Sequence, residues 1–379
     1  MKKNILINAL SIKMGGGLTY LENLLKELPK VSYPFQIFIL LSKENNLSFF
    51  SPEIDFIKIK EPGSLIGKFL FNQFGLRKIL KKYKIDILFQ MANYAMFFCP
   101  IKQVILLRQS HFFSKIFLKN IYPLFSFKKK IDLVLRRFLI ILSVKIADAV
   151  LAPSQAMVDD IKNFVSLPGS KIYVNHYGTY LENFSKSLNP AARANKINLL
   201  YTSHYWDHKN FGTLFEAIAI LDKSISEEFT VLLTIDSDNS LNKNCATFKI
   251  DFDIFSKPEV KKHIKVLGKL SYSQTINIYK EADIFLWPTI TEAFGHPLIE
   301  AMASSLPIVA SDIPINREIC DDVVLYFEPL SPKDFAEKMK LLIENSELRK
   351  TLAEKSSERA KLFDWGNHVR KLFEIFEKI

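Results

Sequence analysis

Two glutamates eight residues apart, Glu292 and Glu300, are the residues of this sequence best suited to chemistry. They belong to the segment WPTITEAFGHPLIEAM at 287–302, in which a short apolar strand leads into a loop and then a helical pattern. Because proline is favoured in the first turn of a helix, Pro297 places Glu300 in that turn and Glu292 in the preceding loop. One carboxylate could accept hydrogen bonds from a ribose diol and the other from sugar hydroxyls.

The start of this helix also predicts an anion site. Backbone N–H groups around Gly295, Leu298 and Ile299 would open toward a ligand, which favours a phosphate. Gly295 would allow the backbone to approach that ligand closely. A structural alternative stays open for Glu300, because an acid in a first helical turn stabilises the helix dipole.

The elements that must position these residues alternate between strand-like and helical patterns along the whole chain. Strands are expected at 4–10, 35–41, 85–90, 103–107, 149–152 and 171–175, and again at 197–203, 229–235, 264–267, 282–287, 308–310 and 323–327. Such alternation predicts an α/β protein with parallel sheets covered on both faces. Ligands of these sheets bind outside the carboxyl ends of the strands. The polar segment 184–196 is expected to link two domains.

Composition narrows the class of protein. No apolar run approaches the roughly 20 residues that span a bilayer, and the opening residues lack the features of a signal peptide. Three cysteines without metal-site spacing favour a reducing cytoplasm and argue against a disulfide framework. Residues 1–190 carry 27 basic and 12 acidic side chains, a net charge of +15, whereas the remainder carries −4. This asymmetry implies an anionic partner for the first half.

The stretch EAFGHPLIE from Glu292 to Glu300 resembles the Glu-x7-Glu signature of glycosyltransferase family 4, retaining enzymes of the GT-B fold. The flanks at 279–288 and 301–312 resemble the same family. The resemblance implies that Glu300 binds the nucleotide ribose and that Glu292 contacts the transferred sugar. It implies that the donor sugar and phosphates are lined by Phe294, Gly295, His296, Pro297 and Leu298.

Other segments resemble further parts of that family's site. The family's strand-to-helix loop supplies a lysine and an arginine to the diphosphate; here Lys209 matches the lysine, whereas His204 stands at the arginine's position. A neutral histidine binds phosphate more weakly than a bidentate arginine does. The glycines Gly16 and Gly17 match a Gly-Gly beside the diphosphate. The loop ending at Leu270 resembles one whose backbone touches the base.

A histidine after a first-half strand is the third catalytic candidate besides Glu292 and Lys209. The family often has a histidine lining the reaction centre near the position of His111, although Arg108 could occupy that position instead. A metal is not expected. The pairs Asp236/Asp238 and Asp251/Asp253 have the Asp-x-Asp spacing of metal-dependent transferases, but two acids so spaced are frequent by chance.

The resemblance implies two Rossmann-like domains with parallel sheets facing each other across a cleft. Residues 1–185 would form the acceptor-binding domain and 186–360 the nucleotide-sugar-binding domain, with the helix at 361–379 packing back on the first domain. The basic, phenylalanine-rich stretches 58–84 and 102–145 fit an anionic membrane surface. They equally fit a core of phenylalanines under a solvated basic face, and they also fit nucleic-acid binding.

The expected function is therefore that of a hexosyltransferase-type enzyme. It would move a sugar with retention from a UDP- or GDP-linked donor to a glycan or lipid-linked saccharide, without a cofactor, in bacterial surface polysaccharide synthesis such as that of lipopolysaccharide, O-antigen or capsule. It would act in the cytoplasm, on the inner face of the cytoplasmic membrane, with no nucleic acid as partner. Two alternatives stay open, a nucleotide-sugar epimerase of the same fold and a non-enzymatic basic binding protein.

Overall fold

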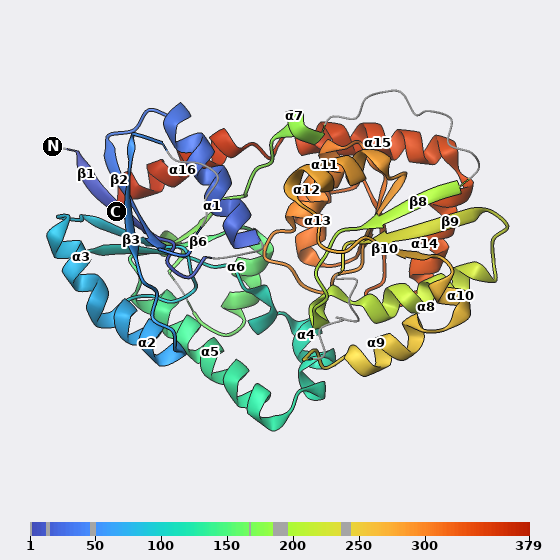
Figure 1. The fold of residues 1–379 in the computed structure, drawn as a ribbon, viewed down its shortest axis with the longest axis horizontal. Helices are drawn as coiled ribbons and strands as arrows, with labels where there is room; N and C mark the ends of the chain where they lie inside the picture. The colour runs from blue at the N-terminus through green and yellow to red at the C-terminus, as the bar shows by residue number, and fades with distance from the viewer. Residues whose placement is uncertain (1, 13–15, 46–50, 167, 185–195, 236–243) are drawn as a thin grey trace. The chain divides into compact units, whose positions relative to one another are not determined.

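The computed structural model describes residues 2–12, 16–45, 51–166, 168–184, 196–235 and 244–379. The chain forms two compact units; in Figure 1 most of unit 1 is blue to green, with its C-terminal helix in red, and most of unit 2 is green to orange-red. Unit 1 holds Met1–Phe113, Ile131–Gly178 and Asp364–Ile379, and unit 2 holds Ser114–Lys130 and Thr179–Phe363. Most of the linker expected at 184–196, including the expected boundary after residue 185, lies outside the described residues.

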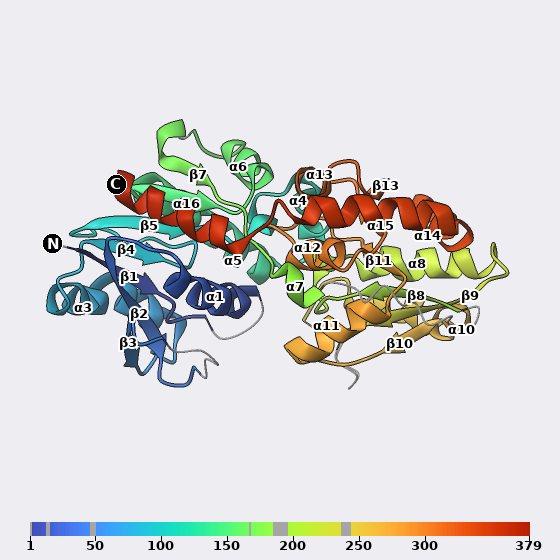
Figure 2. The same cartoon turned by 90° about the horizontal axis from the view of Figure 1, so that it is seen from above.

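Unit 1 is built on a parallel sheet of seven strands in the order β3-β2-β1-β4-β5-β6-β7 (Figure 2). The strands are β1 (Lys3–Asn8), β2 (Phe35–Ser42), β3 (Ile54–Ile59), β4 (Ile87–Gln90), β5 (Lys102–Leu106), β6 (Ala149–Ala152) and β7 (Ile172–Val174). The central strands β4 and β6 are buried at every residue, as a sheet covered on both faces requires.

The helices and helical turns of unit 1 connect these strands. They are α1 (Gly16–Glu27), η1 (Leu28–Lys30), α2 (Leu65–Leu70), η2 (Phe71–Gly75), α3 (Leu76–Lys82), η3 (Ser110–Phe112), α5 (Phe127–Ile146), α6 (Gln155–Lys162), η5 (Gly169–Lys171) and α16 (Trp365–Lys378). The first residues of α5 belong to unit 2. The turn η2 is a single π-helical turn that joins α2 to α3.

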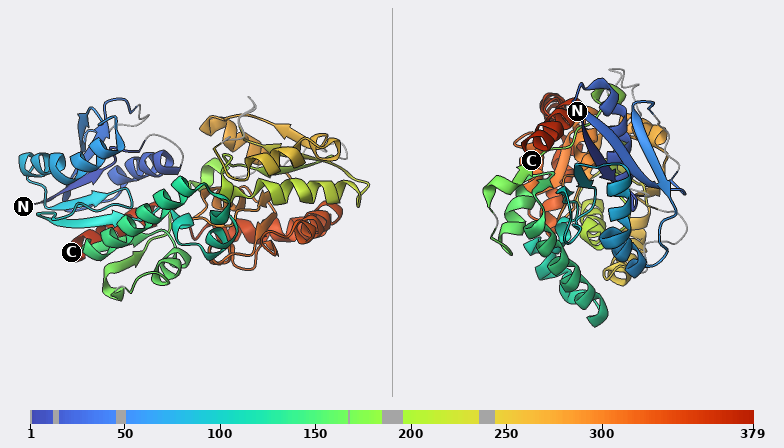
Figure 3. Two further views of the ribbon diagram at one scale, coloured as in Figure 1. Left: turned by 90° about the horizontal axis from the view of Figure 1, so that it is seen from below. Right: turned by 90° about the vertical axis from the view of Figure 1, so that its left-hand side faces the viewer.

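The last helix of the chain, α16, returns to unit 1 and packs against α1 (Figure 3). His368 Nδ1 lies 2.8 Å from the carbonyl oxygen of His176, and Nε2 lies 2.9 Å from the Tyr20 hydroxyl. Because a carbonyl can only accept, Nδ1 carries the proton and Nε2 accepts from Tyr20. A Cβ on Gly178 would lie 2.3 Å from the Trp365 backbone nitrogen, so this contact requires glycine.

Unit 2 is built on a second parallel sheet of six strands in the order β10-β9-β8-β11-β12-β13. The strands are β8 (Lys196–Tyr201), β9 (Glu228–Leu233), β10 (Ile264–Val266), β11 (Ile284–Trp287), β12 (Ile308–Ser311) and β13 (Leu325–Phe327). Its helices and turns are α4 (Lys115–Asn120), η4 (Tyr122–Leu124), α7 (Leu181–Phe184), η6 (Asp207–Lys209), α8 (Phe211–Asp222), α9 (Phe248–Phe255), α10 (Pro258–Lys261), α11 (Tyr272–Glu281), α12 (His296–Ala303), α13 (Pro314–Cys320), α14 (Pro332–Glu344) and α15 (Ser346–Ala360).

Two parallel α/β sheets are therefore confirmed. The strand β3 is absent from the sequence prediction, because Asp55 and Lys58 interrupt its apolar residues and only Ile54 and Ile57 are buried. The three cysteines are free thiols. Among the helices of the described part of the chain, none combines the length and apolar character needed to cross a bilayer.

Candidate functional site

The loop between β11 and α12 in unit 2 carries Glu292 and presents the start of a helix. Gly295 forms the N-cap of α12 with φ of +88°, in the left-handed region that glycine adopts without strain. Pro297 follows within the first turn. The loop is tied to η6 by a hydrogen bond from the Ile290 N–H to the His208 carbonyl at 3.0 Å. Strand, loop and helix thus hold Glu292 at the carboxyl edge of the sheet.

A lysine–glutamate pair forms the centre of this site. Lys209 Nζ lies 2.5 Å from Glu292 Oε1, and both side chains are mostly buried, with 15% and 14% exposure. The ammonium group also lies 4.8 Å from the ring centre of Trp287, whose side chain is fully buried. The Tyr201 hydroxyl donates to the Lys209 carbonyl at 2.7 Å, which fixes the backbone of η6. A cation and a carboxylate are therefore held together, with the cation over the ring of Trp287.

The second glutamate, Glu300, lies on α12. The Tyr279 hydroxyl donates to Glu300 Oε2 at 3.0 Å and lies 2.8 Å from the Thr202 hydroxyl. Although part of the Glu300 side chain remains accessible, its carboxyl group lies deep among protein atoms, and this burial raises its pKa to about 7. The hydrogen bond from Tyr279 opposes that rise. Glu300 is therefore poised to gain or lose a proton near neutral pH.

The structure changes the predicted anion site at the start of α12. The Leu298 N–H donates to the Gly295 carbonyl at 3.0 Å, so it is already used within the helix. The Leu298 side chain is fully buried, and Phe294 is 2% exposed. His296 and Pro297 are half-buried. Any anion at this helix start would rely on the backbone nearer Gly295.

The two remaining donor-site candidates of unit 2 lie on loops at the same carboxyl edge. His204 follows β8 and is exposed, and its carbonyl accepts from the Ser203 hydroxyl at 3.0 Å. Leu270 follows β10 and is half-buried, just before the capping box that starts α11. Neither side chain contributes to the Lys209–Glu292 pair.

Three candidates lie in unit 1. Gly16 opens α1 with free space where a Cβ would stand, whereas a Cβ on Gly17 would lie 2.5 Å from a guanidinium nitrogen of Arg108. His111 lies in η3, half-buried, with its ring 4.3 Å from that of Phe112. Arg108, the alternative to His111, is thus the side chain that packs against Gly17.

The aspartate pairs differ in what can be described. Asp236 and Asp238 lie outside the described residues. Asp251 is buried in α9 and accepts the Tyr205 hydroxyl at 2.5 Å, and burial raises its pKa. Asp253 is exposed. Asp251 therefore has a structural partner within unit 2.

Sequence reasoning gave no role to Tyr279 or Trp287, although both lie in the stretch that resembles the family. Tyr279 joins Glu300 to Thr202, the residue that follows β8. The indole N–H of Trp287 is buried without a hydrogen-bond partner in the described part of the chain, and its nitrogen lies 3.8 Å from the Cβ position of Gly295. The sequence did contain a signal for both residues: Trp287 ends the strand and Tyr279 lies near the end of the helix that precede the two glutamates.

Two parallel α/β units of this kind, with a lysine and two glutamates at the carboxyl edge of the second, are typical of GT-B glycosyltransferases. Residues 14–183 match the family model described as Glycosyltransferase Family 4, and residues 189–359 match the one described as Glycosyl transferases group 1. The chain belongs to glycosyltransferase family 4.

Known proteins similar to this chain include an O-antigen chain mannosyltransferase of Salmonella typhimurium, 26% identical over 221 residues, which is 58% of each chain. The chain spans about half the length of the curated relatives it matches. A sucrose-phosphate synthase from Thermosynechococcus elongatus has a similar fold, with a TM-score of 0.81 and 17% identity over 99% of this chain and 98% of that one. An Anabaena protein solved with UDP-glucose has a TM-score of 0.74 and 16% identity over 99% and 100%.

Proposed function

We propose that this protein is a retaining glycosyltransferase that uses a nucleotide-sugar donor. The observation that carries the proposal is the Lys209–Glu292 pair, 2.5 Å apart on the face of Trp287, with Glu300 eight residues further along on α12. A buried cation beside carboxylates is the arrangement that a sugar diphosphate needs, because the leaving group gains negative charge while hydroxyls need acceptors.

Each side chain has a defined task in this proposal. Lys209 neutralises the departing diphosphate, Glu292 accepts hydroxyls of the transferred sugar, and Glu300 as a carboxylate accepts both ribose hydroxyls. The bond between the anomeric carbon and the phosphate oxygen breaks, and a bond to the acceptor oxygen forms on the same face. The acceptor's proton leaves with the diphosphate. Lys209 supplies the positive charge, so the proposal needs no cofactor.

The donor is a UDP- or GDP-linked sugar, and a structural neighbour solved with UDP-glucose supports this class of ligand. Unit 2 binds the donor and unit 1 the acceptor, with Gly16, Gly17 and His111 at the carboxyl edge of the first sheet. The acceptor is a glycan or lipid-linked saccharide of the bacterial cell surface, supported by the similarity to an O-antigen mannosyltransferase. The basic unit 1 docks on the inner face of the cytoplasmic membrane.

Thermal shift with UDP, GDP, ADP and their sugars tests the donor site. A nucleotide that binds only the folded state raises the unfolding temperature by mass action. We expect one nucleotide family to stabilise the wild type and to lose its effect in Glu300→Ala. The matched control is Glu347→Ala, which removes an exposed acid from the first turn of α15.

Absence of any shift across the panel would count against the nucleotide-sugar proposal. The anomeric configuration of the product, followed by NMR, tests retention. A product with the configuration opposite to that of the donor would overturn it.

A further inference from the structure

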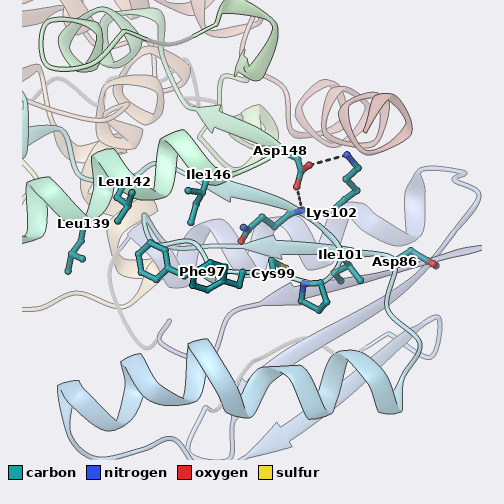
Figure 4. Close-up of a pocket in the computed structure, with 12 residues that line it drawn as sticks. Asp86, Phe97, Cys99, Ile101, Lys102, Leu139, Leu142, Ile146 and Asp148 are labelled. Atoms are coloured by element: carbon teal, nitrogen blue, oxygen red, sulfur yellow. Dashed lines mark hydrogen bonds and ion pairs between the residues drawn. The ribbon is translucent and has the colours of Figure 1, made fainter.

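A large apolar groove lies in unit 1, at the edge of the sheet away from the strand ends that carry Gly16 and His111. Asp86 and Asp148 come directly before β4 and β6, and Lys102 is the first residue of β5, so the three mark the amino-terminal edge of the sheet. The groove has a volume of about 1080 Å³ and lies between α5 and the loop before β5 (Figure 4). That volume lies just above the range of roughly 300–1,000 Å³ for small-molecule sites.

The groove wall from α5 belongs to a longer apolar stripe on that helix. Leu139, Leu142 and Ile146 point toward the loop in Figure 4. At about 100° per residue they share one side of α5 with further apolar residues. These are Ile131, Val134, Leu135 and Phe138, each at least 51% exposed. The opposite side is buried in the core of unit 1 at Ile140 and Val144. Because α5 is apolar on both sides, we expect a second apolar environment to cover its outer side.

The helical segment formed by α2 and η2 continues this exposed apolar surface. On α2 and η2 the exposed side chains are Ile66, Phe69, Leu70 and Phe74. The rings of Phe69 and Phe97 lie 6.2 Å apart, which connects α2 to the groove. Of the twenty large hydrophobic side chains that are exposed in the described residues, ten lie on α2, η2, residue 98 and the unit 1 part of α5.

Phe98 is the most exposed of these side chains, at 90%, and its backbone is strained. Its φ of +55° is a left-handed conformation that a bulky residue rarely adopts. Arg77 holds this conformation by donating to the Phe98 carbonyl at 2.9 Å. Such strain persists only where the surroundings enforce it, and it is typical of ligand sites.

Two buried glutamines keep the loop in place. Gln73 donates to the Ala95 carbonyl at 3.2 Å and accepts the Phe97 N–H at 2.6 Å. Gln103 accepts the Met96 N–H and donates to its carbonyl, both at 3.0 Å. The exposed phenylalanine therefore projects from a fixed loop, and the groove beside it is formed without a ligand.

The charge around this surface is one-sided. Residues 64–84 contain six lysines and arginines and no acidic residue, and residues 131–146 contain three basic residues and one acid. Glu61 neutralises Lys68, at 2.8 Å, and Asp132 pairs with Arg136. The remaining cations favour an anionic partner. A second copy of the chain is disfavoured, because a two-fold interface would place this cationic surface against itself.

We propose that the groove takes an acyl chain of an anionic phospholipid, and that Phe98 and the apolar faces of α2 and α5 insert among the neighbouring lipids. This anchoring site lies on the opposite edge of the sheet from the proposed acceptor position. The inference rests on the proposed membrane function and deepens it, because it names the surface and the lipid moiety that bind.

Vesicle sedimentation tests the surface. With phosphatidylglycerol and phosphatidylcholine at 3:7, we expect the wild type to sediment, and Phe98→Glu and Leu135→Glu each to bind at least tenfold more weakly. The matched control is Ile250→Glu, since Ile250 is 56% exposed on α9 of unit 2. Equal binding by the Phe98→Glu and Ile250→Glu variants, or no sedimentation by the wild type, would overturn the proposal.

Cys99 reports on the groove itself, because it lines the groove while Cys245 and Cys320 are buried. We expect anionic vesicles to slow its alkylation by iodoacetamide at least fivefold. A phosphatidylglycerol with a mid-chain diazirine should crosslink at residues 97–103 and 139–146. Crosslinks that avoid these residues would exclude an acyl chain in the groove. If Cys99 is instead protected from alkylation as protein concentration rises without vesicles, and the protein has the mass of a dimer, the groove is covered by a second copy of the chain and the lipid proposal is overturned.

These results are separable from the transferase proposal. Nucleotide thermal shift without vesicles reports on unit 2 alone. A retained shift with no vesicle binding would overturn the lipid groove and leave the donor site standing. Vesicle binding with no thermal shift from any nucleotide would overturn the donor site and leave the lipid groove standing.

Discussion

The Tyr279 hydroxyl donates to Glu300 Oε2 at 3.0 Å, at a carboxyl whose pKa burial has raised to about 7. Because an ionised carboxylate accepts from both ribose hydroxyls more strongly than a protonated carboxyl does, donor binding should favour the carboxylate. We predict that donor affinity increases as pH rises through about 7 and that binding releases a proton. Isothermal titration in buffers of different ionisation enthalpy measures this proton directly. In Tyr279→Phe the hydrogen bond that lowers the pKa is lost, so the affinity midpoint should move to higher pH.

The matched control for that pH dependence is Glu300→Gln, which keeps the shape of the side chain and cannot titrate. We expect its donor affinity to be weaker and flat between pH 6 and 8. A variant with the same pH profile as the wild type would place the titrating group elsewhere.

Lys209 and Glu292 should be energetically coupled. Removing one partner leaves the other charge unpaired in a mostly buried position. The losses of unfolding free energy in Lys209→Met and in Glu292→Gln should therefore add up to more than the loss in the double variant. Contacting residues show coupling of about 0.5–3 kcal/mol. Urea unfolding of the two single variants and the double variant measures it. Loss of Lys209 should also lower kcat by about 100-fold or more, the scale found for removing a stabilising donor.

An exposed pair provides the comparison for that cycle. Lys361 and Glu358 lie 2.6 Å apart at the end of α15 with 58% and 71% side-chain exposure. Exposed helical pairs contribute about 0.3–0.5 kcal/mol. Coupling no larger than this at Lys209–Glu292 would mean that the buried pair is not a preorganised unit.

His368 should make unit 1 sensitive to acid. Burial lowers its pKa to about 4, from 6.5 in an unfolded chain. Between these pH values His368 is protonated in the unfolded chain and neutral in the folded unit. The free energy of unfolding therefore falls as pH drops from about 6.5 to about 4. The full loss is about 3 kcal/mol at 1.36 kcal/mol per unit. Urea unfolding at pH 5 and pH 7, for wild type and His368→Gln, measures the slope.

The sign at Glu300 is opposite, since its pKa is raised in the folded state. The ligand-free unit 2 should lose stability as pH rises from about 4.5 to about 7. The two effects oppose each other in the whole chain, so single variants reveal slopes that the wild type partly conceals. A His368→Gln variant with an unchanged acid slope would contradict the assignment to His368.

Gly178 should tolerate no side chain. A methyl group would lie 2.3 Å from the Trp365 nitrogen and 2.5 Å from the Asp364 carbonyl carbon, which are backbone atoms that cannot move alone. We predict that Gly178→Ala destabilises unit 1 by about 1–3 kcal/mol or more. Gly169→Ala is the control, because nothing lies within 4 Å of its Cβ position. It should be neutral or stabilising by about 0.4–1 kcal/mol. Thermal unfolding of both variants decides between these outcomes.

The sequence predicted most of the framework because its signals are local. Buried strands such as β11 are continuous apolar runs, and Pro297 with Gly295 marks the start of α12. The Lys209–Glu292 contact joins positions 83 residues apart, and no periodicity encodes it. The family resemblance named both residues but not their pairing.

Other parts of the site were beyond reach for physical reasons. The raised pKa of Glu300 depends on burial, which is a property of packing. The Leu298 N–H was expected to face a ligand, yet it closes the first turn of α12. The groove of unit 1 appeared in the sequence only as a basic, aromatic composition, because its walls come from segments some 40 residues apart.

The return of α16 to unit 1 sets an order of events during synthesis. Tyr20 and Tyr177 leave the ribosome early, but Trp365 and His368, which cover them, follow only after Thr179–Phe363 has been made. At about 5–20 residues per second this interval is roughly 10–40 s. During that interval unit 1 lacks the residues that cover Tyr20 and Tyr177, and unit 2 is still being made. We therefore expect the aromatic side chains of unit 1 that face α16 to stay exposed to water until this helix has been made.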